Sequence, residues 1–361
     1  MYITNYVSYV KIMPLVKKCY HCKVKDLTKI KRVALEQEYV NLQHYLQTKE
    51  DLGLYSANKQ QADRFYKIIK RKTEYPLSIR NNLIRIEHKP STVAEYWIRG
   101  PVGLIRGGLW IGIIKPYEPI SRDAKICECK LYKRDNRWFL DVVVEKNIPE
   151  RLVYQNVIGV DMGIRHIAAS VELASGKTGF YGKNLNRVRG HYWLRRKLGM
   201  KAIDTIKKIG NHETRITNDI VYNISRRIVN RAIESNALIA LGDIKHLRRH
   251  NTNRKFNRKL AGFQYYNLTH FTKYKAALAG IRVIQVSEKW TSQYCRKCYQ
   301  KGVRKIQGLF QCSGEDNADR NAAFNIGHRG LGHASNLGIT VSISRTFPSI
   351  DMNDEKGSDR F

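Results

Sequence analysis

The sequence contains no run of about 18 apolar residues, and its N-terminus lacks the pattern of a secretory signal peptide. It also shows no lipidation motif and no amphipathic basic helix that would favour binding to a membrane surface. These absences argue against a membrane protein. They predict a cytoplasmic one.

Acidic residues are scarce relative to basic ones. The 361 residues include 65 Lys and Arg but only 31 Asp and Glu, which gives a formal net charge of +34 at pH 7. Such an excess favours a polyanionic partner, with nucleic acid first among the candidates. The 21 Tyr, 10 Phe and 5 Trp are interleaved with the basic residues, a composition suited to stacking on bases. We therefore predict a nucleic-acid-binding protein associated with the nucleoid.

Cysteines are too few, and odd in number, for a disulfide framework. Of the 7 cysteines, Cys295 and Cys298 have the Cys-x-x-Cys spacing of a zinc knuckle, and Cys312 follows 14 residues after Cys298. No fourth cysteine completes the set, although His328 and His333 are substitutes further along the chain. Two interpretations stay open, a Zn²⁺ site with an incomplete ligand set and three reduced thiols on a degenerate ribbon.

The periodicity of apolar residues changes twice along the chain. Residues 1–76 predict an N-terminal strand and a helical segment, with helices at about 26–49 and 57–72. Residues 77–155 are rich in Gly and β-branched residues and predict a barrel-like β domain, including a hairpin around 134–136.

From residue 156 the pattern becomes α/β, with short apolar runs between longer helical stretches. We expect a core over 156–289, a ribbon-like insertion at 290–314, the end of the core at 315–334 and a flexible tail at 335–361. Within the core, strands are predicted at about 157–160, 237–243 and 281–286, and helices at about 186–209, 213–235 and 263–279.

Basic residues concentrate in two parts of this core, the helical stretches of 186–235 and the loop of 247–259. They predict the main surface for nucleic-acid phosphates. The residues expected to make these contacts are Arg187, Arg195, Arg196, Lys197, Arg248, Arg249, Arg254, Lys255, Arg258 and Lys259.

Asp161 is the one carboxylate in an otherwise apolar run that continues past Gly163. Burying a carboxylate costs free energy unless it is paired or coordinates a metal, so we expect a cation beside Asp161. Asp319 lies at the start of a predicted helix and could face the same ion. Carboxylates that converge in this way suit Mg²⁺ or Mn²⁺ and two-metal cleavage of phosphodiesters. The alternative is an Asp161 that only caps the turn beside Gly163.

The order of these motifs resembles that of the TnpB (OrfB) family of insertion-sequence proteins, which are relatives of the type V CRISPR effectors. Three segments within residues 60–330 carry the resemblance. They are Ile158-Gly159-Val160-Asp161-Met162-Gly163-Ile164, Thr291-Ser292-x-x-Cys295-x-x-Cys298 and Asn317-Ala318-Asp319-x-Asn321-Ala322-Ala323-x-Asn325-Ile326. The segment 254–260 is also family-like.

The resemblance implies a RuvC-like nuclease core of RNase H type with an inserted zinc ribbon, preceded by a β-barrel and a helical bundle. It implies a guide RNA from the transposon end, a double-stranded DNA target and divalent ions for cleavage. By motif match, Asp161 is the first catalytic carboxylate and Asp319 the third. The family reads a short motif in the DNA through its N-terminal domains, and the same is expected of this chain.

The chain departs from the family at the second carboxylate, where Gly242 occupies the position of a Glu and is followed by Asp243. Successive side chains of a strand point to opposite faces, so Asp243 would face away from the metals unless a bulge at Gly242 re-aims it. The ribbon departs as well, because Tyr299 stands where the family usually has Gly.

These departures leave three hypotheses. The first is a guide-RNA- and DNA-binding protein whose cleavage is impaired by Gly242. The second is an active RNA-guided endonuclease that uses Asp161, Asp243 and Asp319. The third is a decayed element copy without a biochemical role. The sequence alone leaves open whether the chain is an enzyme.

Overall fold

The computed structural model describes residues 15–343, with gaps at 26, 70–73, 90, 92–93, 115–117, 121–123, 164, 200–203, 205–208, 210, 245–263 and 307. The described chain divides into two compact units, which meet in sequence between Asn147 and Ile148. Within the described residues, every helix is too short or too polar to span a lipid bilayer.

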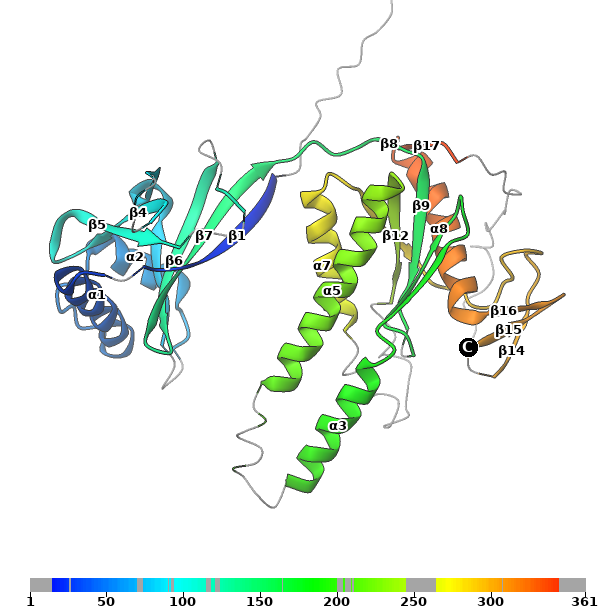
Figure 1. Cartoon of the computed structure of the whole chain (residues 1–361), viewed down its shortest axis with the longest axis horizontal. Coiled ribbons are helices and arrows are strands. Elements are labelled where there is room, and N and C mark those ends of the chain that lie inside the picture. Colours follow the sequence, from blue (N-terminus) through cyan, green and yellow to red (C-terminus); the bar gives the residue numbers. More distant parts are fainter. Residues whose placement is uncertain are drawn as a thin grey trace, which may run out of the picture. The chain divides into compact units, whose positions relative to one another are not determined.

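The N-terminal unit, Leu15–Asn147, combines two antiparallel sheets with two helices (Figure 1). One sheet has the order β1-β7-β6-β2 and the other β3-β4-β5. The strands are β1 (Leu15–Lys23), β2 (Leu77–Arg80), β3 (Arg85–His88), β4 (Tyr96–Val102), β5 (Ile105–Ile113), β6 (Lys125–Arg134) and β7 (Arg137–Asn147). The helices are α1 (Lys29–Thr48), α2 (Ser56–Phe65) and a short 3-10 turn, η1 (Asn81–Leu83).

The predicted hairpin around residues 134–136 is confirmed as β6 and β7. Arg134 pairs with Arg137, so the loop contains only Asp135 and Asn136, with φ angles of 49° and 60°. Two residues with positive φ match the right-handed twist of the flanking strands, and Asp and Asn tolerate that conformation.

The C-terminal unit is built on a five-stranded mixed sheet with the order β11-β10-β9-β12-β13. β9 pairs antiparallel with β10, whereas β12 lies parallel to both β9 and β13. This is the α/β core predicted from residue 156 onwards. Its strands are β9 (Asn156–Asp161), β10 (Ala168–Glu172), β11 (Thr178–Tyr181), β12 (Ala237–Asp243) and β13 (Val283–Ser287).

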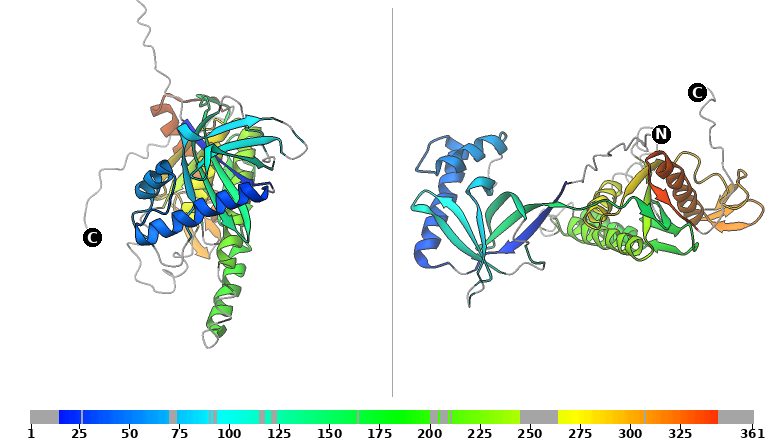
Figure 2. Two further views of the ribbon diagram at one scale, coloured as in Figure 1. Left: turned by 90° about the vertical axis from the view of Figure 1, so that its left-hand side faces the viewer. Right: turned by 90° about the horizontal axis from the view of Figure 1, so that it is seen from above.

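Helices cover both faces of this sheet, α5 and α7 on one face and α8 on the other (Figures 1 and 2). The helices of the unit are α3 (Leu185–Leu198), α5 (His212–Glu234), α7 (Tyr265–Leu278) and α8 (Ala318–Asn336). Between β13 and α8 the chain forms a small sheet of β14 (Val303–Ile306), β15 (Leu309–Gln311) and β16 (Glu315–Asn317). β8 (Val153–Tyr154) and β17 (Thr340–Val341) pair in parallel.

Two boundaries in the N-terminal unit differ from the sequence predictions. The helix expected to reach residue 72 ends at Phe65, where the Tyr66 hydroxyl donates a hydrogen bond to the Pro76 carbonyl at 2.7 Å. The boundary expected near residue 76 separates no units, because α1 and the strands share one hydrophobic core. The described strands of this unit form two sheets, and the closed barrel stays a prediction.

The tail predicted to begin at residue 335 is ordered as far as the described chain extends. α8 continues to Asn336, Ile339 is buried, and the Thr340 amide donates a hydrogen bond to the Leu152 carbonyl at 2.9 Å. The pairing of β17 with β8 involves only Thr340 and Val341, too short a strand for the sequence pattern to predict. Residues 344–361 lie outside the described residues.

Candidate functional site

Asp161 lies at the end of β9, the central strand of the five-stranded sheet. The five preceding residues of β9 are buried, so the strand is fixed by the hydrophobic core. Gly159 faces α8, because a Cβ added to it would lie 2.0 Å from the Ala323 carbonyl oxygen. Asp161 is two residues further along the strand and therefore belongs to the same face.

Asp319 lies in the first turn of α8 and faces the same edge of the sheet. The side chain of Asn317 caps the helix by accepting hydrogen bonds from the amides of Asp319 and Arg320, at 3.0 and 3.1 Å. The Asp319 carboxylate is held by His166 Nδ1 at 2.9 Å, and Arg304 lies 3.7 Å from its other oxygen.

Asp161 and Asp319 interact electrostatically, so the structure brings these two predicted residues together. Burial, with the charge of Asp319 as the second cause, raises the pKa of Asp161 to about 7, and Arg304 opposes the shift. A carboxylate pair in such a position is stabilised by protonation or by a bound cation. The arrangement therefore suits a divalent cation with oxygen ligands.

Sequence reasoning missed Glu288, the first residue after β13. A Cβ added to Gly242 would lie 1.8 Å from Glu288 Oε1, so the glutamate side chain fills the space beside the glycine. Oε1 is buried, and no donor in the described part of the chain forms a hydrogen bond with it. Burial raises the pKa of Glu288 to about 8, with further contributions from the charges of Asp161 and Asp243.

Asp243 lies on the other side of the sheet from the predicted partners. It pairs with Ser287 in a regular parallel register, so the bulge that would re-aim it is absent from this described pairing. Its Oδ1 accepts a hydrogen bond from the hydroxyl of Tyr265 on α7 at 2.9 Å. Because successive side chains of a strand point to opposite faces, Asp243 points towards α7 while Gly242 faces α8. This orientation argues against Asp243 as the replacement for the second carboxylate.

The raised pKa values predict how stability depends on pH when no metal is present. Between about pH 4 and pH 7 the folded protein holds a proton on Asp161 that the unfolded chain has released. The free energy of unfolding should therefore fall as pH rises through this window, and Glu288 should extend the fall to about pH 8. At pH 8 the wild-type protein has to hold a buried, ionised Asp161 beside Asp319, which lowers its free energy of unfolding. Asp161→Asn removes this charge and should raise the free energy of unfolding at pH 8 by on the order of 2 kcal/mol.

Urea unfolding in EDTA at pH 5 and pH 8 measures this difference. The variant and the wild type should converge towards pH 4, where the carboxyl group is protonated in both states. A variant less stable than the wild type at pH 8 would contradict the prediction, and Glu234→Asn on an exposed turn of α5 serves as the control.

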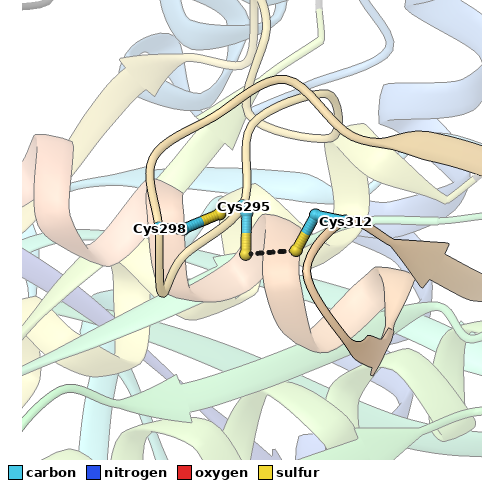
Figure 3. A group of neighbouring side chains, drawn as sticks. All are labelled: Cys295, Cys298 and Cys312. Carbon is cyan, nitrogen blue, oxygen red and sulfur yellow. Dashed lines mark hydrogen bonds between the residues drawn. The ribbon is translucent and has the colours of Figure 1, made fainter.

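The three predicted cysteine ligands do come together, as Figure 3 shows. The sulfur atoms of Cys295, Cys298 and Cys312 all lie within 4.8 Å of one another, and Cys295 is buried. Among the described residues, no other His, Cys, Asp or Glu joins this group, so His328 and His333 are not its fourth ligand. Three thiols with an open position suit Zn²⁺ if water or another group completes the tetrahedron.

Two buried asparagines of α8 form hydrogen bonds with residues 291–296, the segment that contains Cys295. Asn321 Nδ2 donates a hydrogen bond to the Tyr294 carbonyl, and its Oδ1 accepts one from the Arg296 amide at 2.8 Å. Asn325 Nδ2 donates to the carbonyls of Thr291 and Tyr294, both at 2.8 Å. These hydrogen bonds tie the segment that follows β13 to the first turns of α8.

Tyr299 has a φ angle of 57°, a conformation that glycine adopts with less strain. This position is where the sequence departs from the family pattern of the ribbon. Tyr299 therefore makes this backbone conformation less favourable than Gly would. The three sulfur atoms nevertheless lie within 4.8 Å of one another.

Cys312 should be the most reactive of the partly accessible thiols. Its Sγ lies 3.0 Å from that of Cys295, and this hydrogen bond is the main cause that lowers the pKa of Cys312 to about 7. About half of Cys312 is then thiolate at pH 7, against a few per cent for an ordinary thiol. Cys19 serves as the control. The residue is exposed, and partial desolvation of its sulfur, together with the charge of Asp141, raises its pKa.

Alkylation with iodoacetamide at pH 7, mapped by mass spectrometry, should modify Cys312 about tenfold faster than Cys19 in the metal-free protein. Added Zn²⁺ should protect Cys312 and leave Cys19 unchanged. Equal rates at the two thiols without metal would contradict the pKa difference.

The predicted phosphate-binding residues are only partly within the described chain. Arg187, Arg195 and Lys197 are exposed on α3, and Arg196 forms an ion pair with Glu213. Lys197 also lies 5.4 Å from the ring centre of Trp193. The other six lie outside the described residues, namely Arg248, Arg249, Arg254, Lys255, Arg258 and Lys259.

Comparison with known proteins identifies a family model within the C-terminal unit and relatives of the chain. Residues 265–326 match the family described as Cas12f1-like, TNB domain. The chain is 30% identical over 217 residues to the CRISPR-associated endodeoxyribonuclease Cas12f1 of Sulfoacidibacillus thermotolerans. That match covers 54% of the chain and 50% of the relative, so the chain matches half of that protein's length.

Two further matches extend this result. A TnpB-like protein of Methanocaldococcus jannaschii is 24% identical over 204 residues, which cover 50% of the chain and 73% of the relative. The solved structure of a Cas12f1–sgRNA–target DNA complex superposes with a TM-score of 0.53 at 12% identity, over 83% of the chain and 80% of the Cas12f1 chain. This likeness shows a common mixed α/β fold.

Proposed function

We propose, from the premise that the chain is a TnpB-like relative of the type V CRISPR effectors, that it is a metal-dependent, RNA-guided DNA endonuclease. Its partners in this proposal are a guide RNA from the transposon end and a double-stranded DNA target. The observation that carries the proposal is that Asp161, at the end of β9, interacts electrostatically both with Asp319 of α8 and with Glu288, which follows β13.

The carboxylates at this edge fit a divalent ion, since one buried oxygen of Glu288 has no hydrogen-bond donor among the described groups. Asp161 and Asp319 would hold Mg²⁺ or Mn²⁺, which supplies charge stabilisation and a lowered pKa for an attacking water. His166 orients the Asp319 carboxylate, and Arg304 adds a positive charge beside it. These contacts support a site of fixed geometry for cleavage of a phosphodiester.

A guided DNA-binding protein with impaired cleavage is the second candidate, and the absence of a side chain at Gly242 favours it. The position of Glu288 beside that glycine supports the active candidate instead. Both candidates require the same RNA and DNA partners, so only cleavage separates them. A decayed copy without a role is separated from both by cooperative unfolding and specific RNA binding.

The proposed function is tested by expressing the chain together with the genomic segment that flanks its gene. RNA that co-purifies with the protein is sequenced, and the complex is incubated with Mg²⁺ and a plasmid library that carries the complementary target. Cleavage that requires the complementary target and is lost in EDTA supports the endonuclease. Specific RNA binding without cleavage supports the second candidate, and the absence of both overturns the proposal.

Phosphate contacts should dominate the affinity for nucleic acid. Replacing Arg187, Arg195 and Lys197 on α3 by Ala should weaken RNA or DNA binding about tenfold or more at 0.1 M salt. The slope of the logarithm of the association constant against the logarithm of the salt concentration should become shallower by about 2 to 3, because each of the three lost contacts accounts for roughly 0.7 to 0.9 of a released counterion.

Exchanging these residues for the other basic type, Arg187→Lys, Arg195→Lys and Lys197→Arg, is the control. Both types neutralise a phosphate, so most of the salt slope should be retained. An unchanged salt slope in the Ala variant would show that α3 is not part of the nucleic-acid surface.

A further inference from the structure

We propose that Glu288 supplies the second carboxylate of the metal site, in place of a side chain at position 242. The proposal rests on the proposed function for the chemistry of the site, and it concerns one specific ligand. It would give the chain a third acidic group at this edge of the sheet although Gly242 interrupts the family pattern.

The first support is the space beside Gly242. A Cβ on this residue would lie 1.8 Å from Oε1 of Glu288 and 2.5 Å from its Cγ and Cδ. Glu288 therefore occupies the volume in which a side chain of residue 242 would begin. Gly242 lies on the α8 face of the sheet, because the Ala240 Cβ two residues earlier faces Gly330 of α8.

The second support is the direction of the strands. β9, β12 and β13 run parallel, so their carboxyl ends meet at one edge of the sheet. Asp161 ends β9, and Glu288 follows directly on β13. The topology thus brings a carboxylate from β13 to the α8 face of this edge, where β12 has none because its terminal Asp243 binds Tyr265 of α7.

The third support is the fixed backbone of Glu288. Its carbonyl oxygen accepts hydrogen bonds from the amide and the hydroxyl of Thr291, at 3.1 and 2.9 Å. The preceding carbonyl, of Ser287, accepts a hydrogen bond from Arg329 of α8 at 2.6 Å. Because α8 also carries Asp319, the two acidic groups are positioned by the same helix.

The fourth support is the unsatisfied oxygen of the glutamate. Oε1 is buried, and within the described chain it has no hydrogen-bond partner. A buried carboxylate oxygen without a donor is costly, and a divalent cation with hard oxygen ligands would satisfy it. With Asp161 and Asp319, Glu288 would bring the number of acidic groups at this edge of the sheet to three.

The test removes the glutamate at position 288 and introduces one at position 242, first separately and then together. Glu288→Gln should lower guided cleavage by about 100-fold or more and weaken Mn²⁺ binding at least several-fold, while binding of guide RNA and target DNA stays intact. Gly242→Glu alone should also impair cleavage, because the new side chain displaces Glu288. The double variant Gly242→Glu/Glu288→Gly should recover at least about tenfold over either single variant.

Mn²⁺ affinity is measured by calorimetry on the purified full chain, and Mg²⁺-induced stabilisation by thermal unfolding. Glu234→Gln, a glutamate exposed on α5, is the matched control and should change neither quantity. Wild-type Mn²⁺ affinity and cleavage in Glu288→Gln would overturn the proposal. If the wild type binds Mn²⁺ through Glu288 but never cleaves guided DNA, the proposed function fails and the ligand assignment stands.

Discussion

Asp161→Asn should reduce guided DNA cleavage by about a thousandfold or more. The carboxylate ends the central strand β9 and is held at the edge by the buried core behind it. An amide removes one negative ligand from a site that also contains Asp319, and the affinity for a divalent ion falls with it. Single-turnover cleavage of a complementary plasmid in Mg²⁺ measures the effect.

Asp219→Asn is the matched control, since Asp219 is exposed on α5 and the substitution is chemically the same. Binding of guide RNA and target DNA by Asp161→Asn should stay within about twofold of the wild type, because phosphate contacts come from basic residues. Cleavage by the Asn variant at the wild-type rate would remove Asp161 from the catalytic site and leave a capping role beside Gly163.

Gly159→Ala should have the largest effect on stability. An added Cβ would lie 2.0 Å from the Ala323 carbonyl oxygen and 2.4 Å from the Gly327 amide nitrogen. Both are backbone atoms in the middle of α8, so the helix and β9 have to separate. We expect a loss on the order of 3 kcal/mol, which lowers the melting temperature of the C-terminal unit by about 10 °C.

The control for this prediction is Gly332→Ala, on the same helix. No atom lies within 4 Å of a Cβ at that position, and Ala favours a helix by about 1 kcal/mol over Gly. Calorimetric scans of the two variants should therefore shift in opposite directions. Similar melting temperatures for Gly159→Ala and the wild type would show that β9 and α8 adjust to the extra methyl group.

The parts predicted from sequence are those encoded by local patterns. The apolar run before Asp161, the helix start at Asn317 and the turn at Asp135 and Asn136 each depend on neighbouring residues. The convergence of Asp161 with Asp319 could also be expected from the motifs. Strand alternation likewise predicts Asp243 on the face away from Asp161, which agrees with its hydrogen bond from Tyr265.

Glu288 was missed because its role depends on contacts between distant segments. In sequence, Ser287-Glu288-Lys289 has the composition of an ordinary polar turn. Two signals were nevertheless present. A glycine inside a buried strand indicates a close approach by another group, and a third parallel strand delivers its carboxyl end to the same edge.

The close packing of Glu288 against Gly242 also predicts how substitutions at the two positions combine. A side chain at position 242 and the present conformation of Glu288 exclude each other, since the Cβ would lie 1.8 Å from Oε1. The effects of substitutions at the two positions are therefore expected to be non-additive. The effect of a side chain at position 242 then depends on which residue stands at position 288.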